Sequence, residues 1–329
     1  MRFRRTAFLL AIILVGSVAI LAQDDDPIRV DSSIVRLNVG VVDGRGRPVT
    51  DLDRANFEIY EDGVKQNISR FEPVASPFSV VIMLDMSGST IGFRQVIRQS
   101  ASRFIDALSP NDRVAVVEFY DKINLRNDFT TDRGTIFHSI SVADGRGKTQ
   151  FYKALDFALD KLAGEKSRRK AIIVLTDGVD TAVKDIDRDI LEPLKDDQVL
   201  TALKPETSDI LNRILNRADA QGVTIYPLAL PTGDPEKLAD PTQRQKAMFA
   251  AARERLKIVA DRTGGTLNTI NRLEEMGRLY AQVAADLRTL YTIEYQPAND
   301  KRDGKWRAIR IDVRNPDLIS RTRQGYFAK

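Results

Sequence analysis

An unbroken apolar run over residues 80–84 ends abruptly in Asp85, and Ser87 and Ser89 follow at alternate positions. A run without polar positions predicts a strand that is buried on both faces, as in a parallel sheet. Open α/β sheets bind their ligands beyond the carboxyl ends of such strands. One carboxylate and two hydroxyls are therefore expected in a glycine-containing turn at a position where this class of fold binds ligands.

The middle of the chain alternates apolar runs with helix-period segments. The predicted strands are residues 78–85, 113–119, 171–176, 223–230 and 266–269, and the clearest helices are 94–108, 150–162 and 273–287. Alternation of this kind predicts an α/β fold with a doubly wound, mostly parallel sheet flanked by helices. Residues 121–129 are expected to form a hairpin with the second strand and to give one antiparallel edge.

Both ends of the chain show the two-residue alternation of half-buried strands. The predicted strands are 34–39, 57–60 and 68–71 near the start, and 290–295, 306–313 and 325–327 near the end. Two or three strands alone are marginally stable. We therefore expect one small antiparallel β unit, a sheet or sandwich, built from residues 28–75 and 291–329, with the α/β domain at 77–290 between them.

The first 22 residues have the layout of a secretory signal peptide. Arg2, Arg4 and Arg5 precede the apolar stretch 8–22, which contains small residues near its end and stops at three aspartates. The stretch is shorter than the roughly 20 residues that span a bilayer, which favours cleavage over a retained anchor. The protein is thus predicted to be exported, to the periplasm or the cell exterior, with membrane attachment only if the leader is retained.

Composition narrows the classes of partner and chemistry. Removing the three leader arginines lowers the net charge from +4 to +1, so nothing favours binding to nucleic acid or an anionic membrane. The chain has no cysteine, which excludes disulfides, thiolate metal sites and cysteine nucleophiles.

Two further loops carry oxygen ligands. The apolar strand 171–176 ends in Asp177, and Thr149 lies at the start of the helix 150–162. If the strands 78–85 and 171–176 are neighbours, five side chains meet at one edge of the sheet: Asp85, Ser87, Ser89, Thr149 and Asp177. Such hard oxygen donors suit Mg²⁺, Mn²⁺ or Ca²⁺. In the alternative interpretation the serine and threonine only cap helices, and Asp177 belongs to a tight Asp-Gly turn.

The spacing of Asp85-x-Ser87-x-Ser89, Thr149 and Thr176-Asp177-Gly178 resembles the metal-ion-dependent adhesion site of von Willebrand factor A domains. The flanking segments 41–72 and 321–329 resemble an exported bacterial family, the VWFA-related proteins common in Acidobacteria. This resemblance implies a Rossmann-like fold, a divalent cation (Mg²⁺ first, with Mn²⁺ or Ca²⁺ as alternatives) held by the five residues, and a protein partner whose Asp or Glu fills an open coordination position. It implies a cell-adhesion-type binding module rather than an enzyme.

The residue patterns give less support to other functions. Gly147-Lys148-Thr149 lacks the glycine five positions earlier that a phosphate loop needs, because that position is Val142, so no nucleotide is predicted. His138 is the only histidine in the chain, and a single histidine cannot form a multi-histidine metal site. Metal-assisted hydrolysis would need a positioned base that no motif supplies. A purely structural ion, with partner binding by another face, remains the main alternative. The segments 179–206 and 231–243 follow strands at the ligand edge, where specificity would lie.

Overall fold

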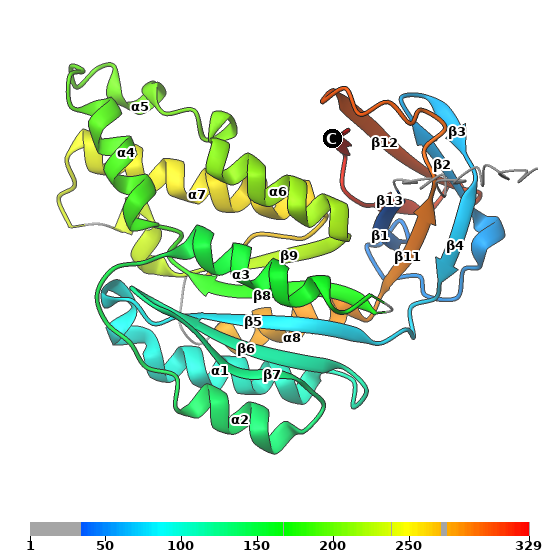
Figure 1. Cartoon of the computed structure of the whole chain (residues 1–329), viewed down its shortest axis with the longest axis horizontal. Helices are drawn as coiled ribbons and strands as arrows, with labels where there is room; N and C mark the ends of the chain where they lie inside the picture. The colour runs from blue at the N-terminus through cyan, green and yellow to red at the C-terminus, as the bar shows by residue number, and fades with distance from the viewer. Residues whose placement is uncertain (1–33, 167, 238, 271–274, 329) are drawn as a thin grey trace, which may run out of the picture. The chain divides into compact units, whose positions relative to one another are not determined.

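The central sheet of this protein has six strands in the order β10-β9-β8-β5-β6-β7 (Figure 1). A computed structural model describes residues 34–166, 168–237, 239–270 and 275–328. Five strands are parallel, and β7 pairs with β6 in the antiparallel direction. The strands are β5 (Phe78–Asp85), β6 (Arg113–Phe119), β7 (Ile123–Thr130), β8 (Arg169–Thr176), β9 (Val223–Ala229) and β10 (Asn268–Thr269). The predicted fold class, including the antiparallel edge, is confirmed.

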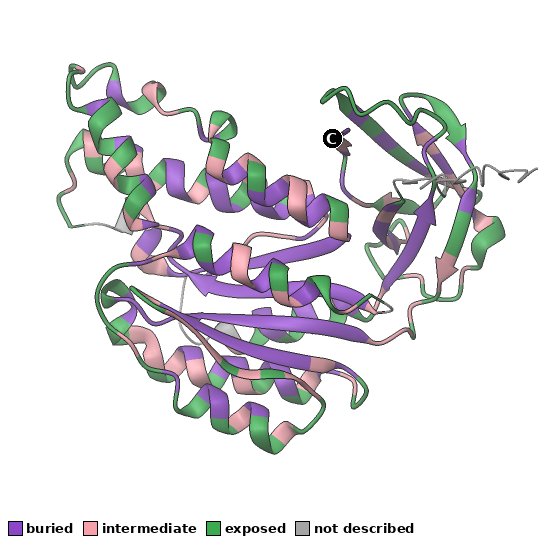
Figure 2. Ribbon diagram, viewed as in Figure 1, coloured by how far each residue is buried: buried purple, intermediate pink, exposed green. Residues whose placement is uncertain are grey.

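Helices cover both faces of this sheet, which explains why every residue of β5 and β8 is buried (Figure 2). One face packs against α1 (Arg94–Ala107), α2 (Arg133–Ser141) and α8 (Met276–Leu287). The other face packs against α3 (Phe151–Ala163), α6 (Asp209–Gln221) and α7 (Gln243–Thr263). Alternate residues of a strand point to opposite faces, so Val80 and Ile82 join the first core and Val81 and Met83 the second.

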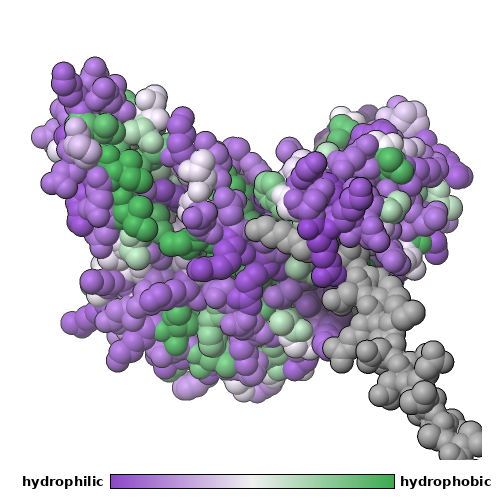
Figure 3. Space-filling model, turned by 45° about the horizontal axis from the view of Figure 1, so that its top comes forward, coloured by the Kyte–Doolittle hydropathy of each residue, from purple (hydrophilic) through white to green (hydrophobic). Residues whose placement is uncertain are grey.

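The segment 179–206 is largely helical, although the sequence suggested no element there. It contains α4 (Thr181–Leu191) and α5 (Val199–Ala202), which pack on α7. Ile186, Ile190 and Leu200 are exposed on these helices. An apolar band is visible on this side of the α/β unit (Figure 3). Short 3-10 helices complete the connections: η1 (Arg54–Asn56), η2 (Gly88–Phe93), η3 (Pro205–Thr207), η4 (Pro231–Gly233) and η5 (Pro235–Lys237).

Strands from both ends of the chain pair with each other in two four-stranded sheets. The first has the order β13-β1-β11-β4 and the second β14-β12-β2-β3. Their strands are β1 (Val35–Val42), β2 (Phe57–Glu61), β3 (Val64–Gln66), β4 (Ile68–Glu72), β11 (Leu290–Tyr295), β12 (Trp306–Val313), β13 (Ile319–Arg321) and β14 (Gly325–Phe327). Leu37 and Ile293 of one sheet share a core with Ile59 and Ile311 of the other. The two sheets therefore form a β-sandwich.

Arg169, the first residue of β8, holds the chain where it enters and leaves the α/β unit. Its guanidinium donates hydrogen bonds to the carbonyls of Val74, Ser76 and Leu290, and it stacks on the ring of Phe78 with its central carbon 4.0 Å from the centroid. A single buried side chain thus ties both connections to the central sheet.

The predicted signal peptide, residues 1–22, lies outside the described residues, as do residues 273 and 274 of the last predicted helix. Among the residues that the structure describes, no helix combines the length and hydrophobicity needed to cross a membrane.

Candidate metal centre

Asp85 is the last residue of β5, and the neighbouring strand holds its carboxylate in place. Oδ1 accepts a hydrogen bond from the amide of Ser87 at 3.0 Å, and Oδ2 accepts one from the hydroxyl of Thr176 at 2.7 Å. Thr176 ends β8, which pairs with β5 in parallel. The two strands were expected to be neighbours if the site existed, and they are. The Asp85 side chain is fully buried as a result.

The turn after β5 leaves its serine hydroxyls free of helix capping. Ser87 occupies the N-cap position of η2, yet its side chain makes no capping hydrogen bond. Its Oγ lies 3.3 Å from Oγ of Ser89 instead. Thr90 fixes the turn, because its hydroxyl lies 2.8 Å from the Asp85 carbonyl and 3.0 Å from the Ser87 carbonyl. Ser87 therefore takes the N-cap position of the alternative interpretation, but its hydroxyl does not make the capping hydrogen bond.

Asp177 follows β8 directly and faces the same turn. Its Oδ1 accepts a hydrogen bond from the amide of Val179 at 3.0 Å, and the hydroxyl of Ser89 is hydrogen-bonded to its carboxylate. The adjacent Gly178 has φ of 81°, a left-handed conformation that other residues rarely adopt. Hydrogen bonds therefore connect Asp85, Ser87, Ser89 and Asp177 in one continuous series.

Thr149 comes from a third loop that touches the same turn. The carbonyl of Gly147 accepts a hydrogen bond from the amide of Gly88 at 3.0 Å, which brings the two loops together. Thr149 itself is buried, and its amide donates to the hydroxyl of Thr181 at 3.0 Å. It lies one residue before the N-cap of α3, which is Gln150, so the structure does not use Thr149 as the cap. Its side chain makes no hydrogen bond to the other four candidate ligands.

The two carboxylates of this site have no ion-pair partner among the described residues, although the positive charges of Arg253 and Lys184 act on Asp177 from beyond ion-pair distance and lower its pKa. Burial, and after it the negative charge of Asp177, raises the pKa of Asp85 to about 7. Burial also raises the pKa of Asp177, although the hydrogen bond from Ser89 opposes this. No Lys or Arg side chain in the described part of the chain forms an ion pair with either aspartate. Two uncompensated carboxylates are costly to bury, and a bound cation would remove that cost.

The donor set fits a hard divalent cation. The candidate ligands are carboxylate and hydroxyl oxygens, which Mg²⁺, Mn²⁺ and Ca²⁺ prefer. Among the described residues no three or more His, Cys, Asp or Glu side chains lie together in a way that could hold a metal ion. The hydroxyls of the serines and Thr149, together with water, would therefore have to complete the coordination of an ion at Asp85 and Asp177.

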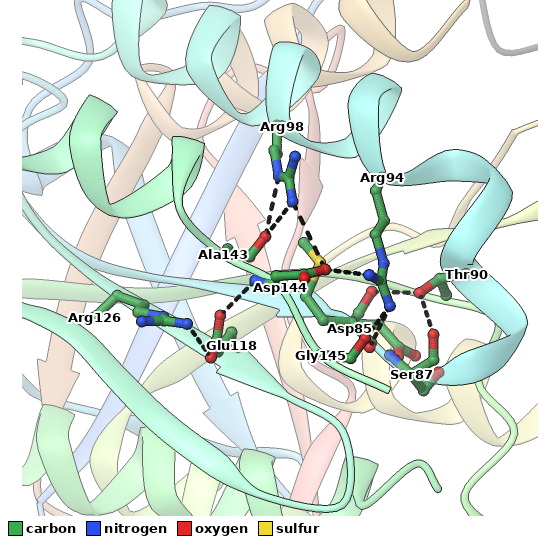
Figure 4. A network of polar contacts seen from close by, with 11 residues as sticks. Asp85, Ser87, Thr90, Arg94, Arg98, Glu118, Arg126, Ala143, Asp144 and Gly145 are labelled. Atoms are coloured by element: carbon green, nitrogen blue, oxygen red, sulfur yellow. Dashed lines mark hydrogen bonds and ion pairs between the residues drawn. The ribbon is translucent and has the colours of Figure 1, made fainter. Parts of the chain in front are cut away.

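A network of charged residues holds the loop that leads to Thr149 against the turn after β5 (Figure 4). Arg94, the first residue of α1, donates to the carbonyls of Met86 and Gly145 and forms an ion pair with Asp144. The buried Glu118 accepts the amide of Asp144 at 3.0 Å and pairs with Arg126 at 2.6 Å. Sequence reasoning missed these residues. The available signal was an acidic residue, Glu118, near the end of the apolar strand 113–119.

Comparison with known protein families gives a match over the part of the chain that contains the candidate site. Residues 80–179 match the family model described as von Willebrand factor type A domain, and this segment contains all five candidate ligands. This segment of the chain is therefore similar to von Willebrand factor type A domains. No curated protein matches the chain in sequence.

Several solved structures are similar to the chain at low identity. A von Willebrand factor type A protein from Catenulispora acidiphila is 14% identical with a TM-score of 0.49, covering 92% of this chain and 64% of that chain. This chain thus spans 64% of the length of that relative. The vWF domain of the type V pili tip protein Mfa5 from Porphyromonas gingivalis is 16% identical, with a TM-score of 0.46, and covers 64% of this chain and 94% of its own. Proximal thread matrix protein 1 from the mussel byssus, whose MIDAS motif is occupied by zinc, is 15% identical with a TM-score of 0.46, covering 67% and 47%.

Proposed function

We propose that this protein is an exported, non-enzymatic binding module that captures a protein partner through a divalent cation. Asp85, Ser87, Ser89, Thr149 and Asp177 would hold the cation, and an Asp or Glu of the partner would complete its coordination. The observation that carries the proposal is the pair of buried carboxylates, joined by serine hydroxyls and not ion-paired with any residue that the structure describes. The predicted leader supports export to the periplasm or cell exterior.

The charges of the site suit an anionic ligand. A divalent cation would balance Asp85 and Asp177, and neutral hydroxyls would add no further negative charge. The bound ion would thus keep the ability to accept a third carboxylate from outside. The role of the protein is to hold the donors at one edge of the sheet, where the turn after β5, the Thr149 loop and the turn after β8 meet. Mg²⁺ is the first candidate, followed by Mn²⁺ and Ca²⁺.

Calorimetric titration of the purified protein with Mg²⁺, Mn²⁺ and Ca²⁺ tests the cation site directly. Asp85→Ala should abolish the binding heat and leave the circular dichroism spectrum unchanged. Asp128→Ala is a matched control, because that exposed carboxylate pairs with Lys161 on the surface, away from the candidate ligands. The proposal is wrong if the wild-type protein binds none of the three ions.

A pull-down from the cell envelope tests the role of the ion in partner capture. Wild-type protein should retain its partner in the presence of Mg²⁺ and release it when a chelator is added, and Asp85→Ala should retain none. Edman sequencing or mass analysis of the exported protein checks the leader, because cleavage after residue 22 would leave a mature chain that starts at Gln23.

A second candidate function is favoured by the three loops that meet at the site. An ion there would join the loops containing Gly88, Gly147 and Asp177, and could act only as a structural staple while another face binds the partner. In that case a chelator should lower the melting temperature but leave partner capture intact at temperatures where the metal-free protein is folded.

A further inference from the structure

A cavity of about 360 Å³ lies beside the candidate metal centre. Thr149, a candidate ligand, forms part of its wall, together with the first residues of α3, the first residues of α4 and the start of α6. We call it the α3–α4 cavity. Because it shares Thr149 with the metal centre, a ligand bound to the cation would extend toward it.

Three cations in the wall of the α3–α4 cavity have no counterion. Lys148, Lys153 and Arg213 line it. None of these three forms an ion pair or a side-chain hydrogen bond with any residue that the structure describes. All three are exposed, so their charges are available to a ligand.

The acidic residues in the same wall are already engaged. Asp156 pairs with Arg217, and Asp185 pairs with Arg188 at 3.1 Å. Asp180 caps α4 and accepts hydrogen bonds from the amides of Ala182 at 3.0 Å and Tyr152 at 3.2 Å. Asp180 keeps its negative charge, because amides do not neutralise it, so three unpaired cations face one unpaired acid and the excess charge at the α3–α4 cavity is positive.

Two further features suit a carboxylate. Tyr152 also lines the cavity, and its hydroxyl, which is buried behind the wall, has no hydrogen-bond partner among the described residues. The amino-terminal ends of α3 and α4 lie at the wall, and their backbone dipoles favour negative charge. Ala182 and Ile210 add apolar surface to the wall, which the methylene groups of a glutamate could contact.

We propose that the α3–α4 cavity binds a second acidic side chain of the same protein partner. The recognised element is then a partner segment with two carboxylates, one on the cation and one among Lys148, Lys153 and Arg213. This inference rests on the proposed function, because the first carboxylate is the one that the cation binds. The second contact involves exposed charges, so it weakens as salt is added.

Labelled hexaglutamate is a suitable probe, because it offers pairs of carboxylates at several spacings. Its binding is measured by fluorescence anisotropy at low salt, with Mg²⁺ or with a chelator. The test variant is Lys153→Glu/Arg213→Glu. The matched control is Arg45→Glu/Lys305→Glu, which reverses two exposed, unpaired cations of the β-sandwich.

We expect the test variant to bind hexaglutamate about tenfold more weakly than wild type in Mg²⁺, and the control to stay within about twofold. Calorimetric Mg²⁺ binding should be the same in all three proteins. Equal weakening in test and control variants would overturn the inference. So would wild-type binding that is absent in Mg²⁺ or unchanged by the chelator. Failure of the proposed function is distinguishable, because it appears as absent Mg²⁺ binding in the calorimeter.

Discussion

Buried carboxylates in this protein occur in two contrasting surroundings. Among the helices, Asp187 of α4 accepts two hydrogen bonds from Arg255 of α7, at 2.7 and 2.6 Å. Asp219 of α6 lies between Arg262 at 2.7 Å and Arg323 at 2.8 Å. At the carboxyl ends of β5 and β8, Asp85 and Asp177 receive hydrogen bonds only from hydroxyls and amides. Asp187 and Asp219 are therefore neutralised by arginines, whereas Asp85 and Asp177 at the edge of the sheet form no ion pair with any described residue.

This difference distinguishes the ion-paired acids from the proposed cation ligands. A buried carboxylate without a cation destabilises the folded state, so its presence needs a compensating role. At the edge of the sheet an external divalent ion can supply the missing charge. The four predictions below ask whether the two kinds of carboxylate respond in opposite ways to mutation, metal and pH.

The largest expected change in the free energy of unfolding concerns the buried carboxylates that are ion-paired with arginine. Arg255→Leu leaves the Asp187 carboxylate buried without its partner, and should lower the free energy of unfolding by about 3–5 kcal/mol. Urea denaturation measures this, with and without Mg²⁺, and the loss should be the same in both. The double variant Asp187→Leu/Arg255→Leu should recover most of the stability. A single variant within about 1 kcal/mol of wild type would contradict the assignment of this pair as a stabilising contact.

The same substitution in the two surroundings should act with opposite sign. In metal-free protein at pH 8, Asp85→Asn removes an uncompensated charge and should raise the free energy of unfolding by about 3 kcal/mol. Asp219→Asn removes a charge that two arginines use, and should lower it by about 2 kcal/mol. Only Asp85→Asn should abolish the rise in melting temperature on adding Mg²⁺. Destabilisation by both variants would remove the distinction.

Most strands were predictable from the sequence, because their apolar patterns end at turn residues. The predicted bounds 78–85, 113–119, 290–295 and 306–313 coincide with β5, β6, β11 and β12. The short edge strands β3 and β13 were missed, since Val64 and Ile319 are exposed and show no burial pattern. Helix α4 was missed for a related reason, because its exposed isoleucines and alternating charges resemble a solvated loop.

The candidate ligands of the site were also predictable from the sequence. The contacts that hold these ligands in position were not. Asp85 and Asp177 mark the ends of apolar runs, which is a local signal. The hydrogen bond from Thr176 to Asp85 depends on the register of β8 against β5, which the sequence does not reveal. The contact between Gly88 and Gly147 likewise joins loops that are far apart in sequence. Long-range positioning was therefore the part that required the structure.

The pH dependence of stability offers a third way to test the contrast. The pKa of Asp85 is raised from its ordinary 3.8 to about 7, so its stabilising contribution is fully present below about pH 4 and is lost as pH rises through 7. Metal-free wild type should therefore lose about 2 kcal/mol of stability relative to Asp85→Asn between pH 5 and pH 8. Saturating Mg²⁺ should reverse the loss. Parallel pH profiles for the two proteins would show that Asp85 is not the uncompensated group.

The smallest expected effect concerns a residue that positions the site without binding the ion. Glu118 joins the two surroundings, because it is fully buried and paired with Arg126, yet it also accepts the amide of Asp144 in the loop that leads to Thr149. Glu118→Gln keeps the shape but replaces one accepting oxygen with a donor. Mg²⁺ affinity measured by calorimetry should fall about tenfold. Glu165→Gln is the control, because Glu165 pairs with Arg113 near the amino ends of the strands. The control should lose similar stability but keep its Mg²⁺ affinity, since its loop carries no candidate ligand. Equal affinity in both variants would mean that the Thr149 loop does not contribute to cation binding.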